Sequence, residues 1–459
     1  MSRIVDPSIT SYQTFPARAF RGLEARPTAV SVASGATDTV SFGGRLGNIT
    51  ESAATSTVCR INTESLQAPL DEVIARMRGR RLRYSMLKTV GNILPGHRVT
   101  ACQKVPSYGV QAGTASRGIS ADANGHTHFH GVGSCGDVWN CPVCAARIAA
   151  GRRSEVQKAM SAHRKTRGVC LLVTFTFPHA NSDSLSENLT CFLDALRRMK
   201  SWRGFKSARE SIGYSAQIRA LEVTHSNANG WHPHAHEIWF LDSTIDKEQV
   251  SVLEDALYTQ WVRACHKVGL GTPSREHGVD VQFRDTDSDD DACGAYVAKW
   301  GSELTFSHMK SGKKGSRTPW SILADLDAEY SFRDAELFRE YSKAFKGRAQ
   351  LFWSRGLKDR YDVEEVSDEV MADAPEKEIV REITPREWAA ILKTDSRVQV
   401  LEVAEFQRER LDDFIQSLVQ RVETQQREKE RLSRDIYRST LEHMAGLRIS
   451  PFDTLSNFP

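Results

Sequence analysis

The sequence has no long hydrophobic run. No stretch of its 459 residues approaches the roughly 18 uninterrupted apolar residues that a membrane-spanning helix needs. The N-terminus, MSRIVDPSITSYQTFPARAF, lacks the apolar segment of a secretory signal. We therefore expect a cytoplasmic protein with no membrane partner.

Other familiar signals are missing as well. There is no internal repeat at the periods of solenoid proteins. No Walker A sequence occurs, because SGKKGS at 311–316 has glycine and lysine at the wrong spacing and is better interpreted as a phosphate-contacting loop. The nine cysteines are odd in number, and Cys170 and Cys191 lie in apolar runs. This favours reduced thiols over a disulfide framework.

Charge is nearly balanced overall, at +3, but it is unevenly distributed. Residues 145–210 carry 13 Lys and Arg against 5 Asp and Glu, whereas residues 361–459 carry 14 against 22. The basic middle predicts an anionic partner, with nucleic acid ahead of a membrane because no basic amphipathic anchor helix accompanies it. The alternative is a solvated surface.

Hydrophobic periodicity predicts an α+β fold in which helices flank an antiparallel sheet. Strands are expected at 169–177, 215–225, 234–240 and 279–283, and helices at 142–165, 185–200 and 247–268. The turn SNANG would join two of the strands as antiparallel neighbours. Five regions follow: a disordered N-terminus (1–64), a basic helix with a Cys/His segment (65–150), a central domain (151–310), a basic loop with helices (311–370) and an acidic helical tail (371–459).

The stretch LEVTHSNANGWHPHAHEIWF, residues 221–240, contains three alternating histidines. His234 and His236 would project from one face of a strand, and the hairpin would bring Glu222 beside them. Because Pro233 cannot donate to a sheet, we expect the strand to begin after it, with His232 at the lip. This set predicts a metal site suited to Mn²⁺, Zn²⁺, Fe²⁺ or Co²⁺, or to Mg²⁺ when phosphate oxygens complete the shell. The alternative is histidines satisfied by solvent and backbone.

A tyrosine in CGAYVAKWGSEL is the candidate nucleophile. On a helix, Lys299 and Glu303 would follow Tyr296 by one and two turns on the same face. A tyrosine is suited to forming a covalent phosphodiester, and Lys299 would lower the phenol pKa or neutralise developing phosphate charge. The alternative is an ordinary core or surface tyrosine.

The cysteines of CGDVWNCPVC form a second candidate metal site. Cys135, Cys141 and Cys144 supply three thiols, and Cys102 is the most plausible fourth ligand, with His128 and His130 as alternatives. Structural zinc takes four nitrogen or sulfur ligands and would stabilise a loop-rich segment. The alternative is cysteines that bind no metal.

The segments LLVTFTFP, EVTHSNANGWHPHAHEIWF and GAYVAKW occur in this order, between CGDVWNCPVCAARI and KGRAQLFWSRGL. The set resembles the motifs of HUH endonucleases, specifically the rolling-circle replication initiators (Rep proteins) of bacterial plasmids and, more distantly, initiators of small isometric phages. The resemblance covers residues 98–361. It leaves the first 64 residues and those beyond about 370 outside.

The resemblance implies an HUH-type antiparallel sheet with an N-terminal zinc-binding segment and a helical C-terminal tail. It implies a metal-dependent single-strand DNA endonuclease and strand transferase of the bacterial cytoplasm, with Mg²⁺ or Mn²⁺ at the catalytic site. His234, His236 and Glu222, with His232, would hold the ion, and Tyr296 would attack the scissile phosphate to leave a 5′-phosphotyrosine and a 3′-OH. Its partners would be single-stranded or cruciform origin DNA and the host helicase and DNA polymerase.

One departure from the family pattern concerns the second cleavage. Phage-type relatives carry a second tyrosine where this chain has Trp300, and some plasmid initiators carry a glutamate where it has Ala292. The terminating step would then need water activated by Glu303 or Asp291, or the tyrosine of a second protomer. The rival interpretations are a transposase or relaxase of the same class, a non-catalytic zinc-ribbon DNA-binding regulator and a metal-dependent hydrolase of small molecules.

Overall fold

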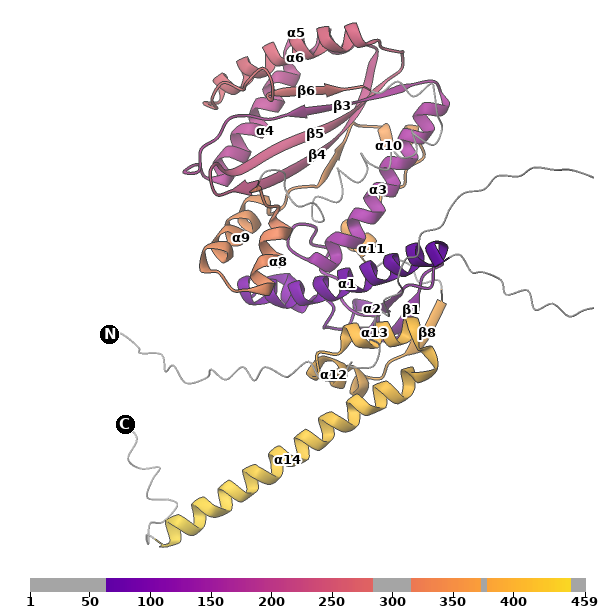
Figure 1. Ribbon diagram of the computed structural model, residues 1–459, viewed down its shortest axis with the longest axis vertical. Coiled ribbons are helices and arrows are strands. Elements are labelled where there is room, and N and C mark those ends of the chain that lie inside the picture. The colour runs from indigo at the N-terminus through magenta and orange to yellow at the C-terminus, as the bar shows by residue number, and fades with distance from the viewer. Residues whose placement is uncertain (1–62, 284–314, 373–377, 447–459) are drawn as a thin grey trace, which may run out of the picture. The chain divides into compact units, whose positions relative to one another are not determined.

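A five-stranded sheet forms the centre of the computed structural model, which describes residues 63–283, 315–372 and 378–446. Its order is β6-β3-β5-β4-β7, and every neighbouring pair is antiparallel (Figure 1). The strands are β3 (Val169–Phe175), β4 (Tyr214–Ser226), β5 (Gly230–Leu241), β6 (Val279–Gln282) and β7 (Leu351–Trp353). A mixed fold of helices and antiparallel sheet, as the sequence predicts, is confirmed.

Both faces of this sheet are buried, because apolar residues alternate between them along each strand. One face, with Val173, Phe175 and Trp239, packs in the core that also contains α4 (Leu185–Ser201) and α6 (Lys247–Lys267). The other face, with Leu172, Ile218, Ile238 and Phe240, packs on Val156, Ala159 and Met160 of α3 (Pro142–Lys165). The sheet is therefore covered by helices on both sides.

The long helices begin where the sequence supplies a cap. The Ser184 hydroxyl accepts a hydrogen bond from the amide of Glu187 at the start of α4. Asp246 and Gln249 form a capping box at the start of α6. Such side chains satisfy amide groups that have no partner within the helix. These local signals explain why the predicted helices 185–200 and 247–268 differ from α4 and α6 by one residue at most.

A second sheet of three antiparallel strands has the order β2-β1-β8. Its strands are β1 (Gly118–Ala121), β2 (Thr127–His130) and β8 (Glu378–Glu382). The sequence analysis did not predict these three strands, because strands of four or five residues are too short for a clear periodic pattern. Gly118 allows the close approach of β8, since a Cβ atom at this position would collide with the carbonyl oxygen of Arg381.

The remaining elements surround these sheets. They are α1 (Thr63–Ile93), η1 (Arg98–Ala101), α2 (Tyr108–Gln111), α5 (Arg203–Glu210), α8 (Pro319–Ala328), α9 (Phe332–Phe345), α10 (Leu357–Arg360), α11 (Asp368–Ala372), α12 (Pro385–Lys393), α13 (Arg397–Phe406), η4 (Arg408–Arg410) and α14 (Leu411–Gly446). No helix in the described part of the chain is long and apolar enough to cross a membrane.

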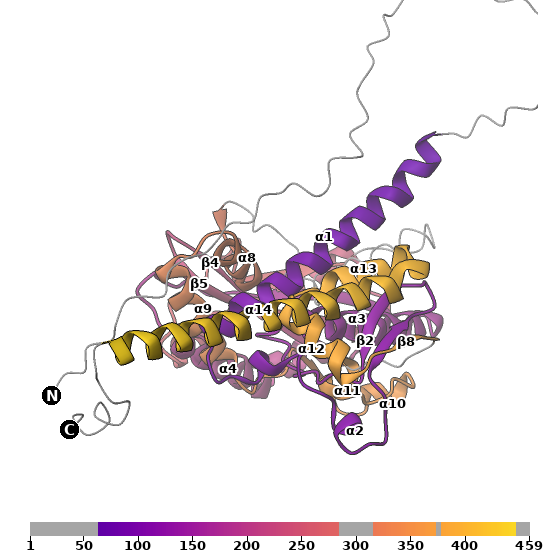
Figure 2. The same ribbon diagram turned by 90° about the horizontal axis from the view of Figure 1, so that it is seen from below.

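The C-terminal helices pack on the N-terminal helix and the small sheet (Figure 2). α13 contacts α1 and β2, and α12 and α13 contact α14. Leu411, Ile415 and Leu418 of α14 are buried in this packing, whereas Phe414 and Val422 are partly buried against it. These apolar residues of α14 therefore make an intramolecular contact, in which Ile415 is completely buried.

Candidate metal centre at the sheet and a four-cysteine cluster

Glu222, His234 and His236 lie together on the face of the sheet that α3 covers. Glu222 of β4 is directly opposite His234 of β5, and His236 follows two residues later on the same face. Oε2 of Glu222 lies 3.3 Å from Nε2 of His234 and 3.8 Å from Nε2 of His236. The hairpin thus brings these three side chains together, with their ligand atoms all within 4.8 Å of one another.

Hydrogen bonds orient both imidazoles of this cluster. Nδ1 of His234 lies 3.2 Å from the carbonyl oxygen of His232. Because a carbonyl only accepts, this nitrogen carries the proton and leaves the lone pair on Nε2, which faces Glu222. Nδ1 of His236 lies 3.0 Å from Oγ1 of Thr174 on β3, so its Nε2 also faces the carboxylate. Fixing a ring through its second nitrogen is the usual arrangement of metal-ligating histidines.

The separations of these ligand atoms fit a single divalent ion. Bonds of about 2.1 Å place neighbouring ligand atoms of an octahedral ion about 3 Å apart. The observed separations of 3.3 and 3.8 Å need only a small contraction to reach that value. Two imidazoles and one carboxylate leave further coordination positions for water or a substrate oxygen. The side chains are 13 to 19% exposed, so a substrate can approach them.

His232 lies beside the cluster but outside the group of three. The expectation that the strand begins after Pro233 was wrong, since β5 begins at Gly230 and Pro233 is paired with Val223. The pairing of β3 with β5 ends at Phe175, which is opposite Ala235. Position 233 therefore has no paired residue of β3 to which a backbone N–H could donate, and proline is tolerated there. Burial, with the neighbouring imidazoles of His234 and His179, lowers the pKa of His232 to about 3, so its ring is neutral.

His179 is a residue of this site that the sequence did not single out. It follows Pro178 at the end of β3, and its Nε2 lies 2.7 Å from Nδ1 of His232. The two rings line an open cleft of about 620 Å³ at the tip of the β4–β5 hairpin. The other lining residues are Thr176, Phe177, Pro178, Thr224, Ser226, Ala228, Asn229, Gly230, Thr272, Pro273, Ser274, His277 and Ser316. Among the described lining residues there is no Lys, Arg, Asp or Glu, so the polar groups of the cleft are hydroxyls, amides and imidazoles.

The predicted nucleophile and its neighbours lie outside the described residues. The flanking residues are placed, however, and both flanks adjoin the large sheet. On one side β6 pairs with β3 at the sheet edge. On the other side Arg317 exchanges two backbone hydrogen bonds with His225 of β4, of 2.7 and 2.8 Å. The predicted residues within this gap are Asp291, Ala292, Tyr296, Lys299, Trp300 and Glu303.

Four cysteines form a second cluster at the start of α3. The Sγ atoms of Cys102 and Cys144 are 3.5 Å apart, as are those of Cys102 and Cys141, and Cys135 lies 3.7 Å from Cys144. Zn–S bonds of about 2.3 Å place the sulfurs of a tetrahedral site about 3.8 Å apart, which matches these separations. Burial raises the pKa of Cys141, so a cation would be needed to stabilise thiolates here.

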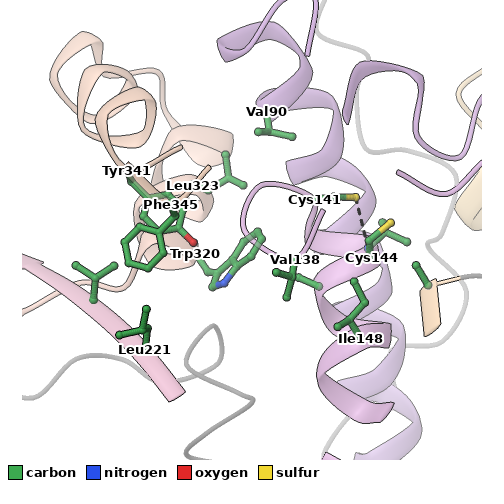
Figure 3. Close-up of a cluster of buried hydrophobic side chains, with 14 of the residues drawn as sticks. Val90, Val138, Cys141, Cys144, Ile148, Leu221, Trp320, Leu323, Tyr341 and Phe345 are labelled. Atoms are coloured by element: carbon green, nitrogen blue, oxygen red, sulfur yellow. Dashed lines mark hydrogen bonds between the residues drawn. The ribbon is translucent and has the colours of Figure 1, made fainter. Parts of the chain in front are cut away.

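The surroundings of the cysteine cluster fix its shape. Sγ of Cys141 accepts a hydrogen bond from the amide of Cys144 at the first turn of α3, next to Val138 and Ile148 (Figure 3). Cys102 is part of the cluster, whereas Nδ1 of His130 bonds with the Ser120 hydroxyl at 2.6 Å. The geometry therefore combines four sulfurs, and neither His128 nor His130 belongs to the group.

The basic side chains of α1 and α3 are largely engaged within the protein. Arg152 binds Asp368, and Arg147 donates to the carbonyl oxygen of Ala372. On α1, Arg76 and Arg80 bind Glu405, and Arg81 binds Glu402. Part of the basic charge that predicted an anionic partner therefore stabilises contacts with the acidic C-terminal region.

Comparison with known proteins gives an independent line of evidence. A 28% identical protein from Streptomyces lividans, described as protein rep, aligns over 305 residues, which is 52% of this chain and 66% of that protein. A neomycin resistance protein from Streptomyces cyanogenus is 29% identical over 181 residues, or 32% of this chain and 40% of that protein. No solved structure matches the chain.

A family model of replication proteins matches residues 128–397, which is more than half of the chain. The match includes the Glu222–His234–His236 cluster and three of the four clustered cysteines. It confirms the predicted relationship to Rep proteins: the chain belongs to the replication protein family Rep_1.

Proposed function

We propose that this protein initiates rolling-circle replication of a plasmid by nicking one strand at its origin. The observation that carries the proposal is the convergence of Glu222, His234 and His236 on neighbouring strands, in a chain of the replication protein family. Oriented Nε2 atoms and one carboxylate beside an open cleft suit a metal-assisted phosphoryl transfer. The similarity to protein rep of Streptomyces lividans supports the same assignment.

Glu222, His234 and His236 would hold the ion, with His232 as a further donor. Bound there, Mg²⁺ or Mn²⁺ would neutralise negative charge on the scissile phosphate. The phenolic oxygen of Tyr296 attacks the phosphorus and forms a phosphotyrosine at the 5′ end. The bond to the 3′ oxygen breaks, and that oxygen takes a proton and becomes a 3′-OH.

The groups around the nucleophile would assist this transfer. Lys299, one helical turn after Tyr296, would stabilise the phenolate and the developing phosphate charge. For the terminating cleavage, Glu303 or Asp291 would activate water, or a second protomer would supply its tyrosine. Either route would take the place of a second tyrosine, because position 300 of this chain is Trp.

The substrate would be single-stranded or cruciform origin DNA, since the transfer needs access to one strand. The host DNA polymerase would extend the 3′-OH. A host helicase would unwind the duplex, because the sequence contains no Walker A spacing.

The four-cysteine cluster would hold structural Zn²⁺. Cys102, Cys135, Cys141 and Cys144 are all buried, and their separations match a tetrahedral sulfur site. The ion would join η1 to the start of α3. It would thereby stabilise the segment between the two sheets and would take no part in the nicking reaction.

Nicking of a supercoiled plasmid that carries the cognate origin tests the proposal. With Mn²⁺ or Mg²⁺, the wild-type protein should convert the plasmid to open circles and become covalently attached to the 5′ end. Tyr296→Phe should abolish both products, and Glu222→Gln should reduce both by weakening metal binding. Tyr437→Phe is the matched control, because this tyrosine is 67% exposed on α14.

The alternatives give other results in the same assay. A non-catalytic regulator would bind the DNA without nicking it in any metal. A relaxase or transposase would nick at sites unrelated to a replication origin. Undiminished covalent attachment by Tyr296→Phe would refute the assignment of the nucleophile.

A further inference from the structure

His179 and His232 form a hydrogen-bonded pair beside the proposed metal centre. Nε2 of His179 lies 2.7 Å from Nδ1 of His232, and the ring centroids are 4.8 Å apart. Nδ1 of His179 lies 2.8 Å from the carbonyl oxygen of Asn229 in the hairpin turn. The ring of Phe177 contacts His179 edge-on, which further restricts its rotation.

This chain of hydrogen bonds has one direction when both rings are neutral. The carbonyl oxygen of Asn229 can only accept, so Nδ1 of His179 donates to it and Nε2 of His179 is unprotonated. That nitrogen must then accept from Nδ1 of His232. A neutral imidazole has a single N–H group, so the lone pair of His232 is left on Nε2.

His232 shares its orientation with the cluster. It occupies the same face of β5 as His234 and His236, and its ring lies 5.3 Å from that of His234 at an interplanar angle of 24°. His234 is locked in the same tautomer by the carbonyl oxygen of His232 itself. Three neighbouring imidazoles of one strand therefore have their Nδ1 atoms engaged by protein groups.

We propose that His179 is a positioning residue, which fixes the tautomer of His232 so that the unprotonated Nε2 remains as a further nitrogen donor for a divalent ion. The inference rests on the proposed metal centre of Glu222, His234 and His236. The hydrogen bond from His179 to the carbonyl oxygen of Asn229 then supports that centre as well. Partners of this kind typically contribute about 10- to 100-fold to metal affinity.

A purely structural role is the competing explanation. The same hydrogen bonds tie the hairpin turn to the end of β3, and they could serve only that purpose. The two explanations differ in what His179→Gln should do. A glutamine can donate its amide N–H to Asn229 and accept from His232 through its amide oxygen, whereas alanine can do neither.

Calorimetric titration of the full-length protein with Mn²⁺ tests the inference. The protein is first loaded with one equivalent of Zn²⁺, which the four thiolates bind ahead of the histidines, and free Zn²⁺ is removed so that only the histidine site takes up Mn²⁺. His179→Ala should bind Mn²⁺ about 10- to 100-fold more weakly than wild type, and His179→Gln within a few-fold of it. In a His232→Ala background, His179→Ala should cause no further loss. Thermal unfolding without Mn²⁺ checks that each variant is folded.

The outcomes separate this inference from the proposed function. If Glu222→Gln binds Mn²⁺ as tightly as wild type, the metal centre itself is wrong. If Glu222→Gln loses affinity but His179→Ala does not, only the role of His179 is overturned. Equal losses in His179→Ala and His179→Gln would also overturn it, because they would indicate packing and not hydrogen bonding.

Discussion

Removal of the Glu405 carboxylate should destabilise the protein strongly. Glu405 lies on α13, and its side chain is 4% exposed. It accepts from Arg76 at 2.7 Å, from Arg80 at 2.5 Å and from the backbone amide of Thr127 at 3.2 Å. This one carboxylate therefore joins α13 to α1 and to the small sheet.

The loss of unfolding free energy can be judged from the buried charge that Glu405→Ala leaves without a partner. Arg80 is 7% exposed, and without Glu405 it keeps a buried and uncompensated charge. Breaking a buried ion pair in this way costs about 3–5 kcal/mol. The exposed pair of Lys88 and Asp395, at 3.2 Å, provides the control. Lys88→Ala should cost about 0–1 kcal/mol, because the Lys88 side chain is 68% exposed.

Urea unfolding followed by circular dichroism at pH 7 measures both free energies. Burial raises the pKa of Glu405, but the hydrogen bonds and charges of Arg80 and Arg76 outweigh it, so the pKa lies below its ordinary 4.5. A depressed pKa contributes stability above pH 4.5 that is lost as the pH falls through the folded-state value. The difference between wild type and Glu405→Ala should therefore shrink below pH 4.5. Equal losses in Glu405→Ala and Lys88→Ala, or a difference unchanged in acid, would refute this explanation.

Two further predictions concern pH and zinc. Burial lowers the pKa of His163, whose Nε2 lies 2.9 Å from the carbonyl oxygen of Leu241 and whose Nδ1 lies 2.6 Å from the Tyr361 hydroxyl. Because the unfolded chain binds this proton more readily than the folded one, the free energy of unfolding should fall as the pH drops below 6.5. His163→Gln should weaken this dependence. If urea titrations show the same slope of unfolding free energy against pH in both proteins, the prediction is contradicted. The purified protein should contain about one Zn²⁺ per chain by atomic emission. Cys102→Ser should release the ion and lower the melting temperature. A wild-type protein that contains no zinc and melts at the same temperature as Cys102→Ser would exclude the metal.

Most of the large sheet could be predicted because its elements have clear boundaries. The predicted helix 142–165 coincides with α3, since Pro142 marks its first turn. The predicted strand 215–225 differs from β4 by one residue at each end. The small sheet could not be predicted, because β1 and β8 lie more than 250 residues apart and are only four and five residues long.

The three-residue cluster was predictable because it is local to a hairpin. Once the turn is placed between Ser226 and Gly230, counting back pairs Glu222 with His234. His179 was not predictable, because its contact with His232 depends on the pairing of β3 with β5, which no local pattern encodes. Cys102 was predicted as the most plausible fourth ligand, but His128 and His130 stayed as alternatives because its place beside Cys144 depends on tertiary packing.

Mass spectrometry of the covalent adduct is the most direct test of the proposed nicking reaction. The protein is incubated with Mn²⁺ and a single-stranded origin oligonucleotide, digested with a protease and a nuclease, and sequenced. We predict a 5′-phosphonucleotide on the peptide that contains Tyr296, together with an oligonucleotide ending in a free 3′-OH. Cleavage without any adduct, or an adduct on another residue, would contradict the account.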